Sequence, residues 1–261
     1  MEKLFVIKIG GNVLDDETCL TSFLQDFAWL PYSKILVHGG GVLATRTARE
    51  LGIEQKVIDG RRITDSETLK VVTMVYAGFV NKQIVSRLQA YNCNAAGFTG
   101  ADGNLISAHK RESASIDYGY VGDVDNINTH FLLNLLKNHV TPVIAPITHD
   151  GQGQLLNTNA DTIAQEISKS LSNFFETSLI YCFEKPGVLK NILDETSLIK
   201  NVDQHSFIKL KNEGVVHSGM LPKLENAFVA LQQGVKNVTI GKAQDLKQLV
   251  HQKAGTTLVH E

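Results

Sequence analysis

A chain of 261 residues, 43% hydrophobic and 20% charged, is long enough to form one large α/β domain or two lobes. Its formal net charge of −2 gives no electrostatic reason to expect a nucleic acid or an acidic membrane as a partner. No apolar run reaches the ~20 residues of a membrane span, and no leader pattern precedes the first strand, so we expect a cytoplasmic protein. The three cysteines, Cys19, Cys93 and Cys182, lack metal-ligand spacing and are expected to be buried and unpaired.

The first predicted strand runs from Leu4 to Ile9 and is apolar except for Lys8. A cation inside a buried strand is costly unless an anionic group meets it. The strand stops at Gly10 and Gly11, whose backbone N–H groups have no side chain that would keep a phosphate away. Alone, the pattern is equally typical of a lysine that reaches solvent from a strand end before an ordinary turn.

A second predicted strand, Lys34 to Val37, leads into His38, then Gly39 to Gly41, and then a helical pattern over 42–51. Three glycines between a strand and a helix let a ligand approach the first N–H groups of that helix. A tight turn explains the same sequence. We interpret His38 as a hydrogen-bonding residue at the strand end rather than as a base.

The pair Arg61-Arg62 is followed by Thr64 and Glu67, a capping-box pattern that predicts a helix start at this point. The arginines can present a guanidinium to a carboxylate, or they belong to a solvated turn. From Leu69 to Tyr91 the sequence has a helical period with a glycine inside, which predicts two helices. Their apolar faces form either core or a dimer surface.

The segment Asn157-Thr158-Asn159-Ala160-Asp161 opens a helix that is predicted to run to about Leu171. Two asparagines and an aspartate are more than one helix needs as caps, which favours a role toward a ligand. Residues 172–177 are predicted to separate two lobes, 1–172 and 173–261. In the second lobe, Pro222 places Lys223 at a helix N-terminus, where the helix dipole disfavours a cation unless an anion lies nearby.

Strands alternate with helices along the chain, which predicts a mainly parallel sheet with helices on both faces. Ligands gather at the carboxyl ends of strands in such sheets. Lysines and backbone N–H groups around glycine turns suit phosphoryl transfer, which needs positioning and neutralisation of charge. A carboxylate acceptor is already ionised at neutral pH and needs no general base. The following residues share this placement: Lys8, Gly10-Gly11, Gly39 to Gly41, Asn157 to Asp161 and Gly187.

Five motifs, in this order, resemble those of the amino-acid kinase family, and within it the kinases of N-acetyl-L-glutamate. The resemblance covers essentially the whole chain. It implies an open αβα sandwich with a mainly parallel sheet, of the carbamate-kinase-like type, in which lobe 1–172 binds the acyl amino acid and dimerises and lobe 173–261 binds ATP. The motifs are Lys8-Ile9-Gly10-Gly11, His38-Gly39-Gly40-Gly41, Gly60-Arg61-Arg62-Ile63-Thr64, Leu156-Asn157-Thr158-Asn159-Ala160-Asp161 and Gly219-Met220-Leu221-Pro222-Lys223.

The implied reaction transfers a phosphoryl group from ATP to the γ-carboxylate of N-acetyl-L-glutamate in arginine biosynthesis. Mg²⁺ would be held mainly by the nucleotide, and no residue is assigned to a metal. By resemblance, Lys8 and Lys223 neutralise the transferring group and Asp161 orients both. Gly10 and Gly11 donate to the phosphates. The remaining assignments are Gly40, Gly41, Arg62, Asn157 and Asn159 for the acyl substrate, and Glu184, Gly187 and His217 for the nucleotide.

Two features depart from the family pattern. Phe183-Glu184-Lys185-Pro186-Gly187 stands where the family has a Ser/Thr-Asp-Val segment, with Glu184 in place of the aspartate. No extra helix precedes the first strand, which implies a homodimer that arginine does not inhibit. N-succinyl-L-glutamate stays open as the substrate, with Arg61 as a candidate for the additional carboxylate.

Three other functions remain as alternatives. Another small-molecule kinase of the family, such as an aspartokinase or glutamate 5-kinase core, would use the same fold. A dinucleotide-dependent oxidoreductase built on Gly39 to Gly41 is disfavoured because the G-x-G-x-x-G pattern is missing. A nucleotide-binding protein without activity would not need Lys8 and Lys223.

Overall fold

The computed structural model describes residues 1–58, 61–212, 214–215 and 221–259. The chain divides into two compact units. Unit 1 contains Met1–Lys34 and Ala164–Glu261, and unit 2 contains Ile35–Ile163. The first strand thus belongs to the same unit as the C-terminal part, so the units do not coincide with the lobes expected on either side of residue 172. The roles expected for those lobes remain predictions.

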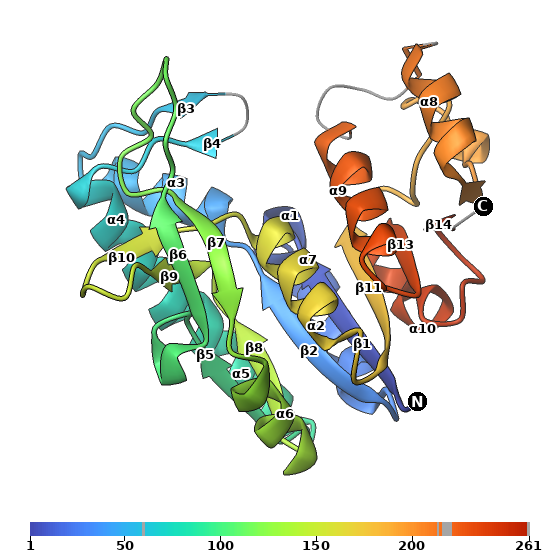
Figure 1. Cartoon of the computed structure of the whole chain (residues 1–261), viewed down its shortest axis with the longest axis horizontal. Helices are drawn as coiled ribbons and strands as arrows, with labels where there is room; N and C mark the ends of the chain where they lie inside the picture. Colours follow the sequence, from blue (N-terminus) through green and yellow to red (C-terminus); the bar gives the residue numbers. More distant parts are fainter. Residues whose placement is uncertain (59–60, 213, 216–220, 260–261) are drawn as a thin grey trace. The chain divides into compact units, whose positions relative to one another are not determined.

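In the described part of unit 1, five strands lie side by side in the order β12-β14-β13-β11-β1 (Figure 1). β1 pairs in parallel with β11, and β11 with β13, whereas β14 runs antiparallel to β13. The carboxyl ends of the three long strands therefore share one edge. Their bounds are β1 Lys3–Ile9, β11 Glu176–Phe183, β12 Asn201–Val202, β13 Asn237–Lys242 and β14 Thr256–Leu258.

The helix α2 shows how the local sequence forms the elements of unit 1. It begins after Asp16, whose side chain accepts a hydrogen bond from the backbone N–H of Cys19 at 2.9 Å. Its apolar side chains Leu20, Phe23, Leu24 and Phe27 are fully buried, which confirms the predicted face. The helices of this part of the chain are α1 Gly11–Asp15, α2 Glu17–Trp29, α7 Ala160–Leu171, α8 Gln204–Asn212, α9 Leu221–Gln232 and α10 Leu246–Leu249, with short 3₁₀ turns η3 Glu195–Ser197 and η4 Ala243–Asp245.

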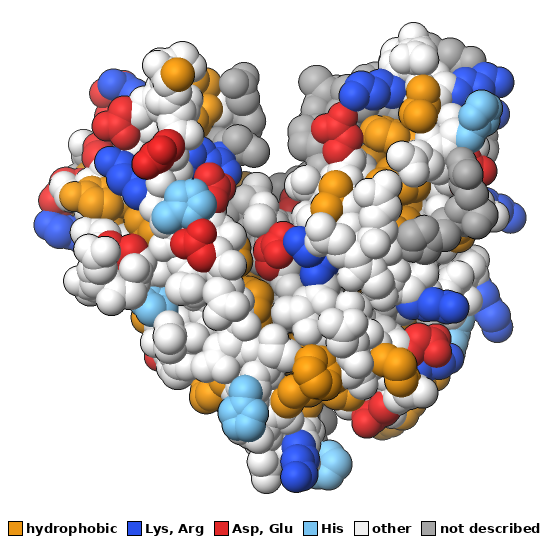
Figure 2. Space-filling view, in the orientation of Figure 1, with side chains coloured by type: hydrophobic (Ala, Val, Ile, Leu, Met, Phe, Trp, Pro, Cys, Tyr) orange, Lys and Arg blue, Asp and Glu red, His pale blue; other side chains and the backbone are white. Residues whose placement is uncertain are grey.

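Unit 2 contains a parallel run of strands in the order β2-β8-β5 and a second sheet in the order β10-β9-β6-β7 (Figure 1). A short antiparallel pair, β3 with β4, precedes its longest helical segment. Over the β6–β7 hairpin, charged side chains of both signs are mixed (Figure 2), as in the pairs Arg111–Asp123 and His109–Asp125. The strand bounds are β2 Ser33–His38, β3 Val57–Ile58, β4 Arg61–Arg62, β5 Ala95–Phe98, β6 Ile106–Lys110, β7 Gly122–Ile127, β8 Thr141–Ile144, β9 Ile147–His149 and β10 Leu155–Asn157.

The helical segment of unit 2 corrects two expectations. Its N-cap is Asp65, which accepts from the N–H of Thr68 at 2.8 Å, so the capping box on Thr64 is wrong by one residue. The segment is also not two separate helices, because a π-helix joins them without a break at Gly78. The bounds are α3 Gly41–Glu50, α4 Ser66–Thr73, η1 Met74–Val80, α5 Asn81–Ala90, η2 Asp102–Asn104 and α6 Thr129–Lys137.

Among the helices of the described residues, none combines the length and the apolarity that crossing a membrane requires. The three cysteines are free and buried, as predicted.

Candidate active site

Lys8 lies in unit 1 near the carboxyl end of β1, where its side chain is only 7% exposed. Its Nζ lies 5.3 Å from the centroid of the Phe183 ring, at the end of the neighbouring strand β11. The same Nζ lies 3.9 Å from the position that a Cβ on Gly10 would occupy. The structure therefore places a buried cation beside the first glycine turn, as the sequence predicted.

Gly10 is the N-cap of α1 and has ordinary backbone angles, with φ −85° and ψ 172°. A Cβ at this position would meet its nearest neighbours at 3.8 Å or more, which is normal van der Waals contact. Neither backbone strain nor packing explains why the residue is glycine. A ligand that approaches the backbone closely would explain it.

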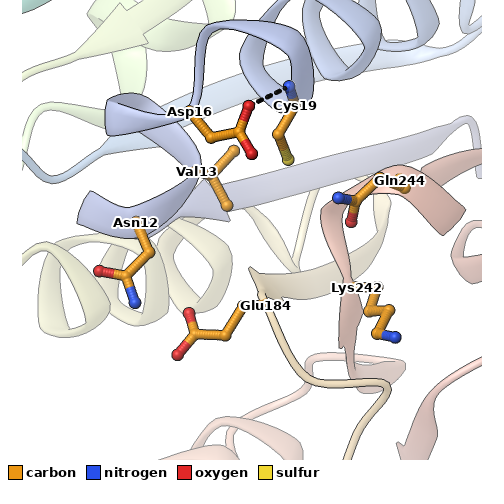
Figure 3. A pocket seen from close by; sticks show the side chains of 7 residues that line it. All are labelled: Asn12, Val13, Asp16, Cys19, Glu184, Lys242 and Gln244. Carbon is orange, nitrogen blue, oxygen red and sulfur yellow. Dashed lines mark hydrogen bonds between the residues drawn. The ribbon is translucent and has the colours of Figure 1, made fainter.

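A pocket of about 380 Å³ opens at the carboxyl ends of β11 and β13 in unit 1 (Figure 3). Asn12 reaches it from α1 and Glu184 from the segment after β11. Lys242 reaches it from the end of β13, and Gln244 from the turn η4. Lys242 also forms an ion pair with Glu195 at 2.7 Å. The pocket thus offers polar groups of both signs. It is lined by Asn12, Val13, Asp16, Cys19, Glu184, Lys242 and Gln244.

The other residues predicted for unit 1 have different surroundings. Gly187 is buried at φ +153°, and a Cβ there would lie 2.6 Å from Oγ1 of Thr256. Packing therefore accounts for this glycine without a ligand. Lys223 belongs to the first turn of α9, next to Pro222, as predicted. His217 lies outside the described residues.

In unit 2, Arg62 contacts the second glycine turn, Gly39 to Gly41. Its Nη2 donates to the carbonyl oxygen of Gly41 at 2.9 Å and to Oγ1 of Thr45 at 2.8 Å, and its Nη1 donates to Oε1 of Gln55. These contacts hold the guanidinium over the start of α3, where the first backbone N–H groups lack partners within the helix. A cation beside helix N–H groups is an arrangement that recognises a carboxylate.

Tyr76 supports this arrangement from the π-helix η1. Its ring lies 2.8 Å from the position of a Cβ on Gly40, whose φ of +151° also favours glycine. Burial raises the pKa of the Tyr76 hydroxyl, and Arg62, its hydrogen-bond partner, opposes the rise. The tyrosine therefore stays neutral and contacts both the glycine turn and the arginine.

Asn157 and Asn159 have different roles in the structure. Nδ2 of Asn157 donates to Oγ1 of Thr64 at 3.0 Å, and Thr64 in turn donates to the carbonyl oxygen of Arg62 at 3.1 Å. Asn157 is thereby joined to the arginine strand. Oδ1 of Asn159 accepts from the N–H of Asp161 at 2.7 Å and so caps the start of α7. The ligand roles of Asn159 and Asp161 remain predictions.

A model of the amino acid kinase family matches residues 3–242. The chain belongs to the amino acid kinase family. An acetylglutamate kinase of Cytophaga hutchinsonii is 50% identical over 262 residues, with 99% of each chain covered. The structure of smu.665 from Streptococcus mutans UA159 has a TM-score of 0.80 at 25% identity and covers 98% of each chain. A Giardia carbamate kinase has a TM-score of 0.72 at 13% identity, over 100% of this chain and 99% of the other.

Membership in the amino acid kinase family and these structural neighbours confirm the α/β fold with mainly parallel strands. Several residues that support the site carry no signal in the sequence. Tyr76 lies in an apolar helical period and looks like an ordinary core residue, so no local signal separates it from its neighbours. Lys242 belongs to none of the five motifs. The other missed residues are Asn12, Thr45, Gln55 and Gln244.

Proposed function

We propose that the protein phosphorylates the γ-carboxylate of N-acetyl-L-glutamate with ATP, which yields an acyl phosphate and ADP in arginine biosynthesis. The 50% identity to an acetylglutamate kinase, over 99% of both chains, is the observation that carries this proposal. The arrangement of Arg62 beside Gly41 supports it, because the substrate is a dicarboxylate.

ATP use follows from membership in a kinase family. Lys8 and the N–H groups of Gly10 and Gly11 receive the phosphates, and Lys223 neutralises the transferring group together with Lys8. ATP supplies the phosphoryl group, and the charge that develops on it is what these groups stabilise. Glu184 and the pocket around it bind part of the nucleotide. Gly187 and His217 are assigned to the nucleotide by resemblance alone, and for Gly187 packing against Thr256 is by itself a sufficient reason for glycine.

Mg²⁺ accompanies the nucleotide in this proposal. Within the described ranges, no group of three His, Cys, Asp or Glu side chains could hold a metal ion. Phosphate oxygens of the nucleotide and water suit Mg²⁺, because it keeps several waters when bound. The chain contributes lysines and backbone N–H groups that neutralise the phosphates.

The acyl substrate is assigned to unit 2. Arg62 binds its α-carboxylate, the N–H groups of Gly40 and Gly41 contact it, and Asn157 holds its amide region with Asn159 nearby. Its γ-carboxylate is ionised at neutral pH and attacks without a general base. Asp161 is proposed to orient the two lysines.

We also propose that the protein acts in the cytoplasm as a homodimer. The π-helix η1 exposes two large apolar side chains, Met74 at 56% and Phe79 at 59%. Burial of these side chains against a second copy would remove apolar surface from water. Sedimentation equilibrium of the wild type and of Phe79→Lys tests the proposal. A wild type that stays monomeric at micromolar concentration would contradict it.

The test of function is a steady-state assay with Mg-ATP in which hydroxylamine traps the acyl phosphate. N-acetyl-L-glutamate is compared with N-succinyl-L-glutamate, L-glutamate and L-aspartate. We expect hydroxamate with N-acetyl-L-glutamate and little with the free amino acids. Preference for the succinyl compound would keep the reaction and change the acyl group. Hydroxamate from none of the four, with ATP binding intact, would overturn the proposal.

A further inference from the structure

His38 is the last residue of β2 and has no exposed surface. Its Nδ1 lies 2.7 Å from the carbonyl oxygen of Gly39, and its Nε2 lies 3.1 Å from Nδ2 of Asn81. A carbonyl oxygen only accepts hydrogen bonds, so Nδ1 must carry the proton and donate. Nε2 then accepts from the amide of Asn81. The two partners thus select one neutral tautomer.

The amide of Asn81 is itself fixed in orientation. Its Nδ2 also donates to the carbonyl oxygen of Val143 on β8 at 3.0 Å, and its Oδ1 accepts from Nζ of Lys82 at 3.1 Å. A Cβ on Gly97 would lie 1.8 Å from the same Oδ1, so only glycine leaves room for the amide at this point of β5. Every polar atom of the Asn81 side chain therefore has a partner that prevents it from flipping.

Burial lowers the pKa of His38 to about 4, and the charge of Lys82 on α5 acts in the same direction. The hydrogen bond to Gly39 opposes the shift. The imidazole is therefore neutral at the pH at which a cytoplasmic kinase works.

The contact with Gly39 determines the direction of the next backbone N–H group. In a planar trans peptide the C=O and the N–H point to opposite sides, and the described residues contain no cis peptide. Because the carbonyl of Gly39 points toward the buried imidazole of His38, the N–H of Gly40 points away from that imidazole. Gly40 is the N-cap of α3, and Gly41 is its first residue.

The π-helix η1 brings both supports to this turn. Tyr76 lies within it and contacts Gly40, while Asn81 follows it directly and contacts His38. These two residues are five positions apart, which is the hydrogen-bond spacing of a π-helix. An α-helix would turn them to different faces, since its neighbours on one face are three and four positions apart.

We propose that His38 and Asn81 are positioning residues that hold the Gly39 carbonyl inward and thereby aim the N–H of Gly40 at the acyl substrate. The proposal rests on the proposed function, because it takes Gly40 and Gly41 as substrate contacts. His38 does not touch the substrate and transfers no proton. Loss of His38 should therefore weaken binding of the acyl amino acid and leave the affinity for ATP unchanged.

Two matched variants test the proposal. The amide nitrogen of an asparagine can take the place of the donor Nδ1, whereas the amide oxygen of a glutamine can take the place of the acceptor Nε2. His38→Asn therefore keeps a donor for Gly39, and His38→Gln keeps the contact with Asn81 but loses that donor. We expect KM for N-acetyl-L-glutamate to rise about tenfold in His38→Gln and about threefold or less in His38→Asn, since one hydrogen bond is at stake. KM for ATP should not change in either.

A histidine that only fills space predicts the reverse order, because glutamine matches its volume better. Equal effects in both variants, or a smaller effect in His38→Gln, would overturn the proposal. The exposed His130 on α6 provides the control pair, His130→Asn and His130→Gln, in which we expect no change. If the wild type forms no hydroxamate, the proposed function fails.

NMR spectroscopy tests the proposal without enzyme turnover. In ¹⁵N-labelled protein we expect His38 to show the Nδ1–H tautomer from pH 6 to pH 9. The amide signals of Gly40 and Gly41 should shift in His38→Gln and stay near their wild-type positions in His38→Asn. An Nε2–H tautomer, or equal amide shifts in the two variants, would contradict the positioning role.

Discussion

The turn after β1 contains Gly10 and Gly11, and the turn after β2 contains Gly39, Gly40 and Gly41. Both follow parallel strands and precede a helix, yet they need glycine for different reasons. At Gly10 the backbone angles are ordinary, and a side chain would have room. At Gly40 the backbone has φ +151°, and a side chain would collide with Tyr76.

The surroundings of the two turns differ in the same way. The first turn has a buried cation, Lys8, and a pocket with polar walls beside it. In the second turn, Arg62 and His38 each hydrogen-bond to a glycine carbonyl oxygen, and the Tyr76 ring fills the space that a side chain at Gly40 would need. Glycine in the first turn leaves space for a ligand, while in the second turn it is also a requirement of packing.

The largest expected effect is a loss of kcat on substitution of Lys8. It distinguishes this lysine, which we expect to act in catalysis, from Lys34, which we expect to stabilise the fold. Lys8 and Lys34 are both 7% exposed, and each lies over an aromatic ring, at 5.3 Å and 5.4 Å. Lys34 donates to the carbonyl oxygens of Ala28 and Leu30 at the end of α2, whereas Lys8 lies beside the Gly10 turn. We expect Lys8→Met to lower kcat by a factor of about 10²–10³, which is the usual effect of removing a group that stabilises the transition state.

Lys34→Met is the matched control. It should keep kcat and lower the free energy of unfolding by about 1–3 kcal/mol, because two carbonyl groups lose their donor. Hydroxamate assays and thermal unfolding measure both quantities. Similar kcat losses in the two variants would remove the distinction between the lysines.

The comparison of the glycine turns predicts opposite behaviour of two alanine variants. Gly40→Ala combines unfavourable backbone angles with overpacking against Tyr76, and should lower the free energy of unfolding by roughly 2–5 kcal/mol. Gly10→Ala should change it by less than about 1 kcal/mol and still lower kcat, because the methyl group obstructs the phosphates. Calorimetry and the hydroxamate assay test the pair. A stable Gly40→Ala would show that packing is not what requires that glycine.

The second turn should also make stability depend on pH through His38. Its pKa is lowered to about 4 in the folded state and is about 6.5 when unfolded, so the unfolded chain binds more protons in between. Stability from this group is complete above pH 6.5 and is lost as the pH falls toward 4. Between pH 6.5 and pH 4, the free energy of unfolding of the wild type, measured with denaturant, should fall by about 3 kcal/mol more than that of His38→Asn. Parallel pH curves would contradict this prediction.

The smallest expected effect concerns the arginine of the second turn. Arg62→Lys keeps the charge but cannot reach Gly41, Thr45 and a substrate carboxylate with one ammonium group. KM for N-acetyl-L-glutamate should rise about tenfold while KM for ATP stays constant. Arg49→Lys, on the exposed end of α3, is the control. An equal change in the KM for ATP would mean that Arg62 does not serve the acyl substrate.

Much of the fold could be predicted because local patterns encode it. The buried face of α2, the strand that ends at Lys8, and the helix that begins near Lys223 all follow from periodicity, glycine and proline. Two details could not be predicted in this way. Asp65 rather than Thr64 caps α4, because Thr64 is already engaged with Asn157, which lies 93 positions away in the chain. The π-helix at Gly78 likewise leaves no clear pattern in the sequence.

The sequence by itself determined that polar groups would stand at the carboxyl ends of parallel strands, since alternation of strands and helices places Lys8, Gly10 and Gly40 there. Only the tertiary structure decided where the approach of a ligand is the reason for the residue type and where packing is the reason. Gly187 and Gly40 are glycines because Thr256 and Tyr76 lie against them, whereas no neighbour of that kind lies against Gly10. The reason is that the space around a residue depends on distant parts of the chain, which local sequence does not specify.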